Sequence, residues 1–269
     1  MKYKIVIILI IILFFICVYN IPYKLTENSI IPKYVWQTYK TKDLPAPALA
    51  LRNGWVSMNP SYNVILYDDN DIETYIKQYW DRRMYAFYKV LPLGVMKADL
   101  WRYLVLTTHG GVYSDIDSKC LLPVNYWFHD FVGENALVIG LENNIHFCQW
   151  NMYCTKNHPA MQHICKYILE RYERDGINTE DEHFVHNTTG PAVWTAAIKS
   201  YLDLEHLTNA VDIFDMYKKD RSEFIKKGIY LLEQDYFTHI YTKNIYGSQN
   251  FGDGYVKWTD ERDKLVKKN

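Results

Sequence analysis

The sequence lacks the features that mark several common classes of protein. Its 269 residues contain no internal repeat and no low-complexity segment, so the chain is not a repeat protein. It has no block of basic residues and no arginine-rich stripe, and its 30 Lys and Arg nearly balance 31 Asp and Glu. Nucleic acid is therefore not an expected partner. The five cysteines have no C-x-x-C spacing, which argues against a zinc site.

The length and composition fit one domain of generous size, or one domain with an appendage, because half of the residues are apolar.

Four cysteines lie outside the N-terminal apolar run, and their spacing leaves open whether one or two disulfides form in an oxidising compartment. The one N-glycosylation sequon is Asn187-Thr188-Thr189. Its asparagine is either a glycan acceptor or, given the neighbouring "TGP" turn, an active-site amide.

The N-terminus carries a hydrophobic segment. Lys2 and Lys4 precede an unbroken apolar run from Ile5 to Tyr19, which spans about 22 Å as a helix, short of a hydrocarbon core of about 30 Å. Flanking lysines that snorkel and thinner internal membranes allow such a run to span. A cleaved signal peptide is the alternative, but the small residues of a cleavage site are missing.

We therefore expect an uncleaved signal-anchor at residues 1–22, a short stem at 23–30 and a single domain at 31–269. Positive charge before the run places the N-terminus in the cytoplasm. The body is then expected in the lumen of the Golgi or endoplasmic reticulum, as in a single-pass type II membrane protein.

Strand-like and helix-like segments alternate along the body. Strands are predicted at 31–38, 61–69, 112–117 and 135–143. Helices are predicted at 45–58, 70–80, 82–91, 94–111, 158–173 and 190–202, with a capping box from Asn70 to Glu73 and Pro191 in a first turn. This alternation predicts an α/β fold with a mostly parallel sheet covered on both faces.

Polar residues gather where the predicted strands end, which is where ligands bind in such sheets. They are Gln37, Thr38, Asp68, Asp69, Asp115 and Asp117.

Asp115 and Asp117 form a D-x-D pair with three interpretations. They cap a turn, they include the nucleophile of a phosphatase-like site, or they hold Mg²⁺ or Mn²⁺ against a diphosphate. The phosphatase interpretation fits poorly because the pair comes in mid-chain and continues into "SKC".

The helix before this pair carries a second pair of charges. Asp99 and Arg102 are three residues apart, so they share a helical face with apolar Val95 and Leu106. The pair is either a buried salt bridge or part of a polar site in which Arg102 holds phosphate or sugar oxygens.

These residues lie in a longer stretch, "KADLWRYLVLTTHGGVYSDIDS", that resembles the signature of glycosyltransferase family 32. Within that family the likeness is to the initiation-type α-1,6-mannosyltransferases of the fungal secretory pathway. Shorter likenesses follow in order in "IPKYVWQTYK", "NPSYNVILYDDND", "NHPAMQ" and "TGPAVWTAAI", and together they cover residues 31–201.

The resemblance implies a GT-A type fold with a Rossmann-like mixed sheet, a divalent cation (Mn²⁺ or Mg²⁺), and transfer with retention of the anomeric configuration. It assigns the metal to Asp117, with Asp115 contacting ribose or sugar and reaching the metal through water. It assigns donor-sugar hydroxyls to Asp99 and Arg102. The nucleotide-sugar is assigned to Trp36, Gln37, Thr38, Gly111, Thr189 and Gly190. Gly110 and Gly111 also have a conformational reading, as the point where the helix stops and the chain turns.

Family members complete the metal site with a histidine and a Gly-Ser-Trp-like stretch near the end. Here Ser248 takes that position in "YGSQNF", with no histidine immediately before it.

The sequence therefore predicts a membrane-anchored, metal-dependent, retaining hexosyltransferase acting on a glycan or glycoconjugate. GDP-mannose is the expected donor, and UDP-sugar galactosyl- and glucosyltransferases share the same motifs. A glycan-binding pseudoenzyme of the same fold is the alternative from another functional class.

Overall fold

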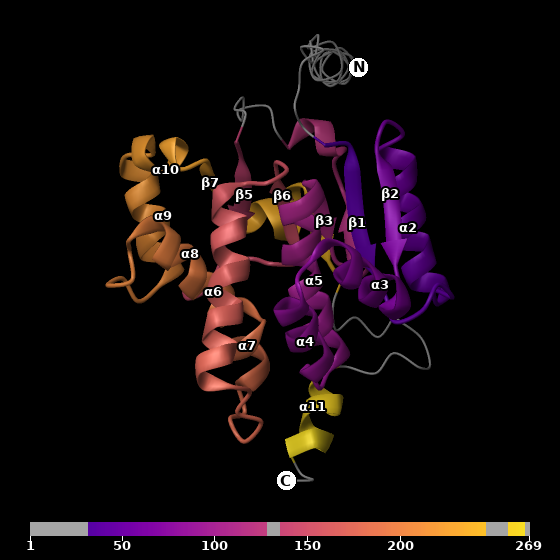
Figure 1. Cartoon of the computed structure of the whole chain (residues 1–269). Helices are drawn as coiled ribbons and strands as arrows, with labels where there is room; N and C mark the ends of the chain where they lie inside the picture. Colours follow the sequence, from indigo (N-terminus) through magenta and orange to yellow (C-terminus); the bar gives the residue numbers. More distant parts are fainter. Residues whose placement is uncertain (1–31, 128–134, 246–257, 267–269) are drawn as a thin grey trace, which may run out of the picture. The chain divides into compact units, whose positions relative to one another are not determined.

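The computed structural model describes residues 32–127, 135–245 and 258–266, all of which belong to one unit that spans residues 31–269. Figure 1 shows the chain coloured along its sequence. The expected signal-anchor and stem lie outside the described residues. Within the described ranges, no helix combines the length and the apolar character needed to cross a membrane.

A central sheet of six strands organises the unit (Figure 1). Its order is β2-β1-β3-β6-β5-β7. The strands are β1 (Tyr34–Thr38), β2 (Asn63–Tyr67), β3 (Gly111–Ser114), β5 (Leu137–Gly140), β6 (Asn151–Cys154) and β7 (Ile229–Leu232). The β1–β2, β1–β3 and β5–β7 pairs are parallel, and β6 runs antiparallel to both of its neighbours. The sheet is thus mixed, as expected, with one reversed strand.

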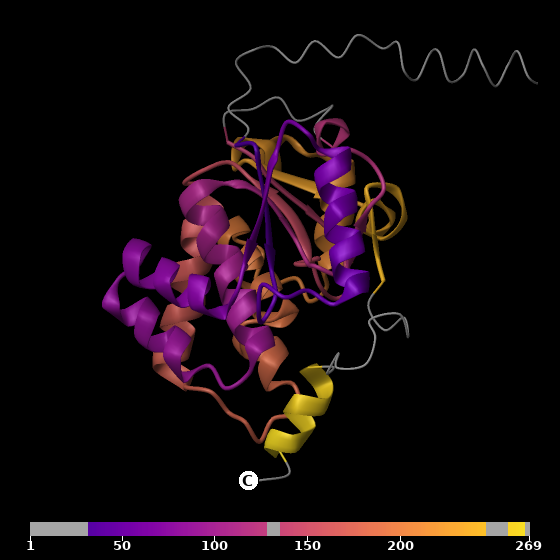
Figure 2. The ribbon, with the colours of Figure 1, turned by 90° about the vertical axis from the view of Figure 1, so that its right-hand side faces the viewer.

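Helices and short helical turns cover the sheet. They are α2 (Ala46–Met58), α3 (Asp69–Tyr79), α4 (Arg82–Val90), α5 (Gly94–His109), η1 (Val124–Tyr126), α6 (Pro159–Asp175), α7 (Phe184–Thr188), α8 (Pro191–Leu202), α9 (Ala210–Lys219), α10 (Ser222–Lys226), η2 (Tyr236–Ile240) and α11 (Trp258–Val266). Figure 2 shows the sheet between α2 on one side and α4 and α5 on the other.

Alternation along the strands creates two cores. Trp36 and Tyr113 point into the larger core with α3, α4, α5, α6, α8 and α9. Their neighbours Val35 and Val112 point to the other face, where Trp55 of α2 and Trp127 pack. Because successive strand residues face opposite sides, a sheet covered on both faces needs apolar residues at consecutive positions. The apolar runs in the sequence meet that need.

A second, two-stranded sheet lies just after the acidic pair. It joins β4 (Ser118–Cys120) to β8 (Thr242–Asn244) in antiparallel register, with Ser118 opposite Asn244. Ile245, one residue beyond β8, donates its backbone N–H to the Asp117 carbonyl at 3.1 Å. A distant part of the chain is therefore fixed against the D-x-D turn.

The expected elements agree with the structure in type and differ at their ends. The strand predicted to include Asp115 and Asp117 ends at Ser114, so both acids lie in the turn that follows it. The predicted capping box is wrong: Asp68 caps α3 and Asp71 completes the box, because the helix begins one residue earlier than Asn70. Pro191 is in the first turn of α8, as predicted.

Gly110 and Gly111 end α5 with φ angles of 67° and 98°, which non-glycine residues rarely adopt. A Cβ on Gly111 would also lie 2.7 Å from the Tyr34 carbonyl oxygen. Their conformational role is thus confirmed.

The four cysteines of the described chain are Cys120, Cys148, Cys154 and Cys165. They are all buried and all free, so none of them forms a disulfide.

Candidate active site

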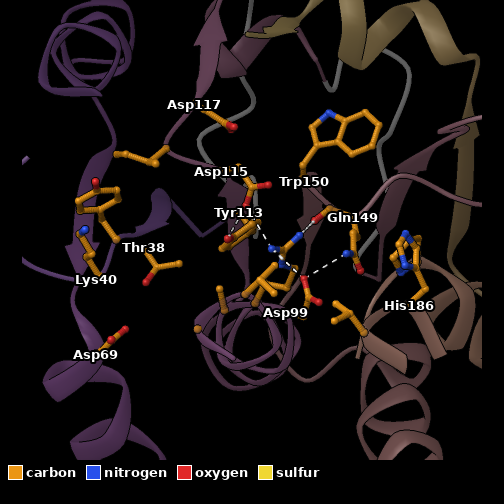
Figure 3. A pocket seen from close by; sticks show the side chains of 18 of the residues that line it. Thr38, Lys40, Asp69, Asp99, Tyr113, Asp115, Asp117, Gln149, Trp150 and His186 are labelled. Carbon is orange, nitrogen blue, oxygen red and sulfur yellow. Dashed lines mark hydrogen bonds and ion pairs between the residues drawn. The ribbon is translucent and has the colours of Figure 1, made fainter. Parts of the chain in front are cut away.

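A cavity of about 470 Å³ opens where β1 and β3 end (Figure 3). Its wall includes Thr38 at the end of β1, Asp99 and Arg102 from α5, and Asp115 and Asp117 after β3. Ligands bind at this edge of α/β sheets because the loops there converge. The structure therefore brings five of the predicted site residues to one cavity, although 77 residues separate Thr38 from Asp115 in the sequence.

The Asp115 carboxylate is held on two sides. The Tyr113 hydroxyl donates to Asp115 Oδ1 at 2.7 Å, and Arg102 Nη2 lies 3.2 Å from the same oxygen. The backbone of Asp115 is also fixed, since its N–H donates to the Trp150 carbonyl at 2.9 Å. About 29% of the side chain remains exposed. Asp115 thus presents a fixed carboxylate whose open side faces the cavity.

Asp117 is placed differently. It is only 8% exposed, and its Oδ1 atom is buried without a hydrogen-bond partner among the described residues. Burial, reinforced by the charge of Asp115, raises the pKa of Asp117 to about 7. A buried carboxylate oxygen without a partner costs free energy, which a bound cation would offset.

The donor set fits a hard divalent cation, because such ions prefer carboxylate oxygens. The described ranges contain no group of three or more His, Cys, Asp or Glu residues placed to hold a metal. Two carboxylates with further oxygens from a diphosphate are the arrangement that these residues support. Ser248, the other expected metal ligand, lies outside the described residues.

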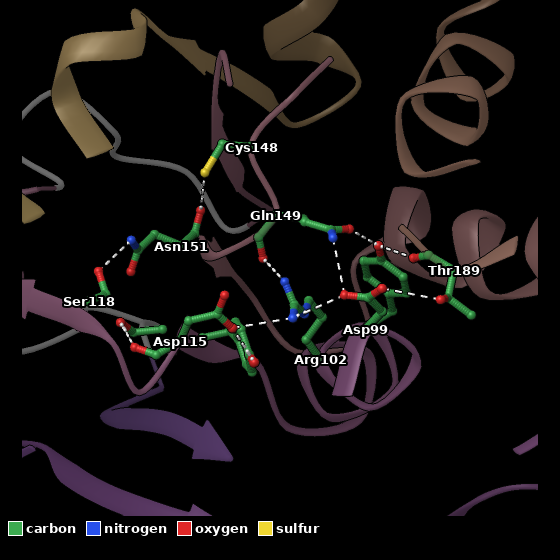
Figure 4. A network of polar contacts seen from close by, with 11 residues as sticks. Asp99, Arg102, Asp115, Ser118, Cys148, Gln149, Asn151 and Thr189 are labelled. Carbon is green, nitrogen blue, oxygen red and sulfur yellow. Dashed lines mark hydrogen bonds and ion pairs between the residues drawn. The ribbon is translucent and has the colours of Figure 1, made fainter. Parts of the chain in front are cut away.

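Arg102 joins the two acidic elements into one network (Figure 4). Its Nη2 atom lies 3.1 Å from Asp99 Oδ1 as well as near Asp115, and its Nη1 donates to the Gln149 carbonyl at 2.9 Å. The guanidinium also lies over the Tyr113 ring, 4.7 Å from its centre. The side chains of Asp99 and Arg102 are almost fully buried yet form part of the cavity wall.

Asp99 receives two further hydrogen bonds. Gln149 Nε2 donates to one carboxylate oxygen and the Thr189 hydroxyl to the other, both at 3.1 Å. Tyr103 links these two partners, since its hydroxyl contacts Gln149 Oε1 at 2.5 Å and the Thr189 carbonyl at 2.8 Å. Burial raises the pKa of Asp99 to about 7, and the charge of Arg102 opposes that shift. The network fixes the orientation of Asp99 from both sides.

Five of the six expected nucleotide-binding residues do not line this cavity, and three of them belong to β1 and β3. Trp36 is buried in the larger core, and its Nε1 donates to the Gly110 carbonyl at 2.8 Å. Gln37 is fully buried, with neither amide atom partnered among the described residues. Gly111 is buried beside Tyr34 and Trp36. Strand alternation and sheet pairing turn these residues inward, whereas Thr38, the last residue of β1, reaches the cavity.

The "TGP" turn lies beside the network. Thr189 is fully buried and binds Asp99, so it acts on the cavity through that carboxylate. Gly190 precedes α8, and a Cβ there would lie 2.8 Å from His186 Cα. Pro191 lines the cavity. The Asn187 amide donates to Asp181 at 2.8 Å and does not line this cavity, so the structure gives no support to an active-site amide.

Several cavity residues cannot be predicted from the sequence. Gln149 and Trp150 come just before β6, Glu142 lies in the turn after β5, and His186 belongs to the short helix α7. None of them stands in a motif of its own. Tyr113 is a residue that the sequence could have indicated, since it lies in the family signature two residues before Asp115.

Comparisons with known proteins agree with the resemblance seen in the sequence. Residues 47–132 match the family model described as "Glycosyltransferase sugar-binding region containing DXD motif". The solved structure titled "PaToxG Glycosyltransferase" superposes with a TM-score of 0.50 at 19% identity, over 78% of this chain and 85% of that one. This likeness supports the GT-A-like fold.

Curated relatives agree with the family model. The chain is 27% identical to the initiation-specific alpha-1,6-mannosyltransferase of Candida albicans, over 75% of this chain and 60% of that protein. It is 29% identical to the protein of the same name from Schizosaccharomyces pombe, over 70% and 52%. Inositol phosphoceramide mannosyltransferase 3 of S. pombe is 30% identical over 55% and 40%. The chain spans about half the length of the curated relatives it matches.

The resemblance read from the sequence is thereby confirmed: residues 47–132 match the model of the D-x-D glycosyltransferase sugar-binding region, and the relatives found include initiation-specific α-1,6-mannosyltransferases.

Proposed function

We propose that this protein is a metal-dependent, retaining glycosyltransferase that moves a hexose, mannose from GDP-mannose, onto a glycan or glycoconjugate acceptor. One observation carries the proposal: the wall of one cavity contains Asp99, Arg102, Asp115 and Asp117. In this wall, Asp117 has a buried carboxylate oxygen without a hydrogen-bond partner among the described residues. The names of the curated relatives favour mannose as the transferred sugar.

Asp117 and Asp115 would hold Mn²⁺ or Mg²⁺. When bound, such a cation neutralises the charge on the leaving diphosphate. The chain's own residues have separate tasks. Arg102 is a fixed cation at the base of the cavity and stabilises negative charge on the donor. Asp99, held by Gln149 and Thr189, accepts hydrogen bonds from sugar hydroxyls and fixes the ring that reacts.

We also propose that the N-terminal segment anchors the chain in a Golgi or endoplasmic-reticulum membrane with the catalytic unit in the lumen. The support is the apolar run after Lys2 and Lys4.

A donor panel tests the proposed activity. The full chain is incubated with Mn²⁺ and with GDP-mannose, UDP-galactose or UDP-glucose, and release of the nucleoside diphosphate is measured. We expect release from GDP-mannose, its loss with EDTA and its return with Mn²⁺. Release from a UDP-sugar alone would move the chain to the galactosyl- or glucosyltransferases. Donor binding with no release from any sugar nucleotide would favour a pseudoenzyme.

A further inference from the structure

The cavity has two sides of different chemistry (Figure 3). Thr38, Lys40 and Asp69 lie on one side of Asp115, whereas Trp150 and His186 lie on the other. The first side includes the residue of the expected nucleotide set that reaches the cavity, Thr38, and a lysine suited to phosphate. The second side comes from the β5–β6 region and α7, outside residues 47–132 that the family model matches.

Glu142 stands out on the cavity wall. It follows β5 and lies in a tight turn, where its N–H donates to the His146 carbonyl at 2.9 Å. Its carboxylate lines the cavity without a hydrogen bond or ion pair from any described residue. The two buried carboxylates of the cavity are Asp99, which has protein partners, and Asp117, which belongs to the D-x-D pair, whereas Glu142 is partly exposed. An acceptor left open in this way is suited to a ligand that donates hydrogen bonds.

Trp150 adds a donor and an apolar surface. Its Nε1–H is buried without an acceptor among the described residues, and its ring is partly exposed. His186 contributes an imidazole, and burial lowers its pKa, so the ring is neutral at pH 7 and can both donate and accept.

The charge of this side selects the kind of ligand. Burial, reinforced by the charge of Asp99, raises the pKa of Glu142 to about 7. The ionised form repels a diphosphate and the protonated form offers it no positive charge, so Glu142 disfavours the charged half of a sugar nucleotide in either form. It suits an uncharged molecule rich in hydroxyls. A pyranose ring has a C–H face that packs on indole and a rim of hydroxyls that donate and accept. The cavity volume, about 470 Å³, falls in the range of about 300–1,000 Å³ typical of small-molecule sites.

We propose that Glu142, Trp150 and His186 form the subsite that binds the pyranose ring of the acceptor glycan. The proposal rests on the proposed function, because an acceptor exists only if the chain transfers a sugar. Glu142 accepts a hydrogen bond from an acceptor hydroxyl, and Trp150 supports the ring and donates through Nε1.

Kinetics on the full chain test the subsite. With GDP-mannose and Mn²⁺, p-nitrophenyl α-mannoside, α-glucoside and α-galactoside serve as acceptor probes, and donor hydrolysis in water is measured in parallel. For Glu142→Ala and Trp150→Ala we expect the acceptor KM to rise about tenfold or more, with donor hydrolysis within about twofold of wild type. Glu142→Gln and Trp150→Phe, which keep an amide oxygen or an aromatic ring, should lose less.

Glu205→Ala is the matched control, because Glu205 is exposed and away from the cavity. Melting curves of every variant show whether it is folded. An unchanged acceptor KM in folded Glu142→Ala and Trp150→Ala would overturn the proposal. An equal loss of transfer and of hydrolysis would also overturn it, since both residues would then serve the donor.

Binding separates this inference from the proposed function. Saturation-transfer NMR with p-nitrophenyl α-mannoside needs no turnover. If wild type hydrolyses no donor but binds the glycoside in a way that Glu142→Ala abolishes, the proposed activity fails and the sugar subsite stands. If wild type hydrolyses GDP-mannose but the glycoside signal does not depend on Glu142 or Trp150, the subsite fails and the activity stands.

Discussion

Arg102 of α5 and Asp115 after β3 form an ion pair, with Nη2 and Oδ1 3.2 Å apart, and the same Nη2 lies 3.1 Å from Asp99. One buried cation therefore fixes carboxylates from two elements. The sequence left two interpretations of the Asp99–Arg102 pair, a salt bridge that holds the helix or a part of the site. The geometry satisfies both, because the pair is buried and also forms cavity wall.

Replacing Arg102 should therefore harm stability and activity together. Arg102→Ala leaves two carboxylates uncompensated, so we expect a loss of about 3–5 kcal/mol in the free energy of unfolding. We also expect kcat/KM for the donor to fall at least about a hundredfold in protein that remains folded, which is about 2.7 kcal/mol of transition-state binding. Denaturant unfolding and donor kinetics measure the two effects.

Arg83→Ala is the control for this variant, because Arg83 pairs with Glu173 on the surface, where ion pairs contribute less than about 1 kcal/mol. A large drop in stability with near-normal turnover would make Arg102 a scaffold residue only. Normal stability with lost turnover would mean that the buried network tolerates the missing charge.

The metal assignment gives a prediction that does not depend on activity. Saturating Mn²⁺ at about a hundred times its Kd should stabilise wild type by about 2.7 kcal/mol. Asp117→Asn should abolish this shift, because an amide cannot supply the anionic oxygen that the ion prefers. Transfer should fall about a hundredfold or more.

Asp69→Asn is the matched control for the metal, since Asp69 lines the same cavity outside the D-x-D pair and should keep the Mn²⁺ shift. A melting temperature of Asp117→Asn that rises with Mn²⁺ as in wild type would remove Asp117 from the metal site. Full transfer in EDTA would remove the metal itself.

The site residues on α5 and directly after β3 could be predicted from the sequence, because they lie on one regular stretch of chain. Apolar periodicity and the glycines after His109 define one helix that runs into one strand. Asp99, Arg102 and the acidic pair then follow at fixed distances along the chain. Local regularity of this kind is what a sequence shows directly.

The rest of the site depends on pairing between distant segments. Gln149 and Trp150 precede β6, which pairs with β3 through a reversal that four-residue strands do not reveal in a sequence. Glu142 lies in a turn without a motif. Trp36 is the opposite case: it was expected at the nucleotide, but packing of the sheet against α3 and α5 turns it inward. Tertiary contacts decide which of two equally polar or aromatic residues reaches a cavity.

The membrane proposal predicts a fractionation result. The full chain should sediment with microsomes and resist alkaline carbonate, because an apolar run of this length partitions into lipid. Protease added to intact microsomes should leave residues 31–269 protected, and detergent should expose them. Digestion without detergent would show that the orientation inferred from Lys2 and Lys4 is wrong.

His158 makes stability depend on pH. It is fully buried before α6, where its Nδ1 accepts the Ala160 N–H at 3.1 Å. Burial lowers the pKa of His158 to about 4, below the value of about 6.5 expected in an unfolded chain. Between these values the unfolded state binds the proton more readily. The stabilising contribution of neutral His158 is therefore complete above about pH 6.5 and is lost as pH falls through 4.

The loss should amount to about 3 kcal/mol, because one pKa unit corresponds to about 1.4 kcal/mol. His158→Asn keeps a side chain that can cap the helix but does not titrate. Its free energy of unfolding should be lower than that of wild type at pH 7, where a smaller side chain packs less well, yet fall less steeply between pH 7 and 4. Urea unfolding at half-unit pH steps gives both slopes, and His206→Asn, an exposed histidine, should keep the wild-type slope. Equal slopes in wild type and His158→Asn would show that His158 does not cause the acid sensitivity.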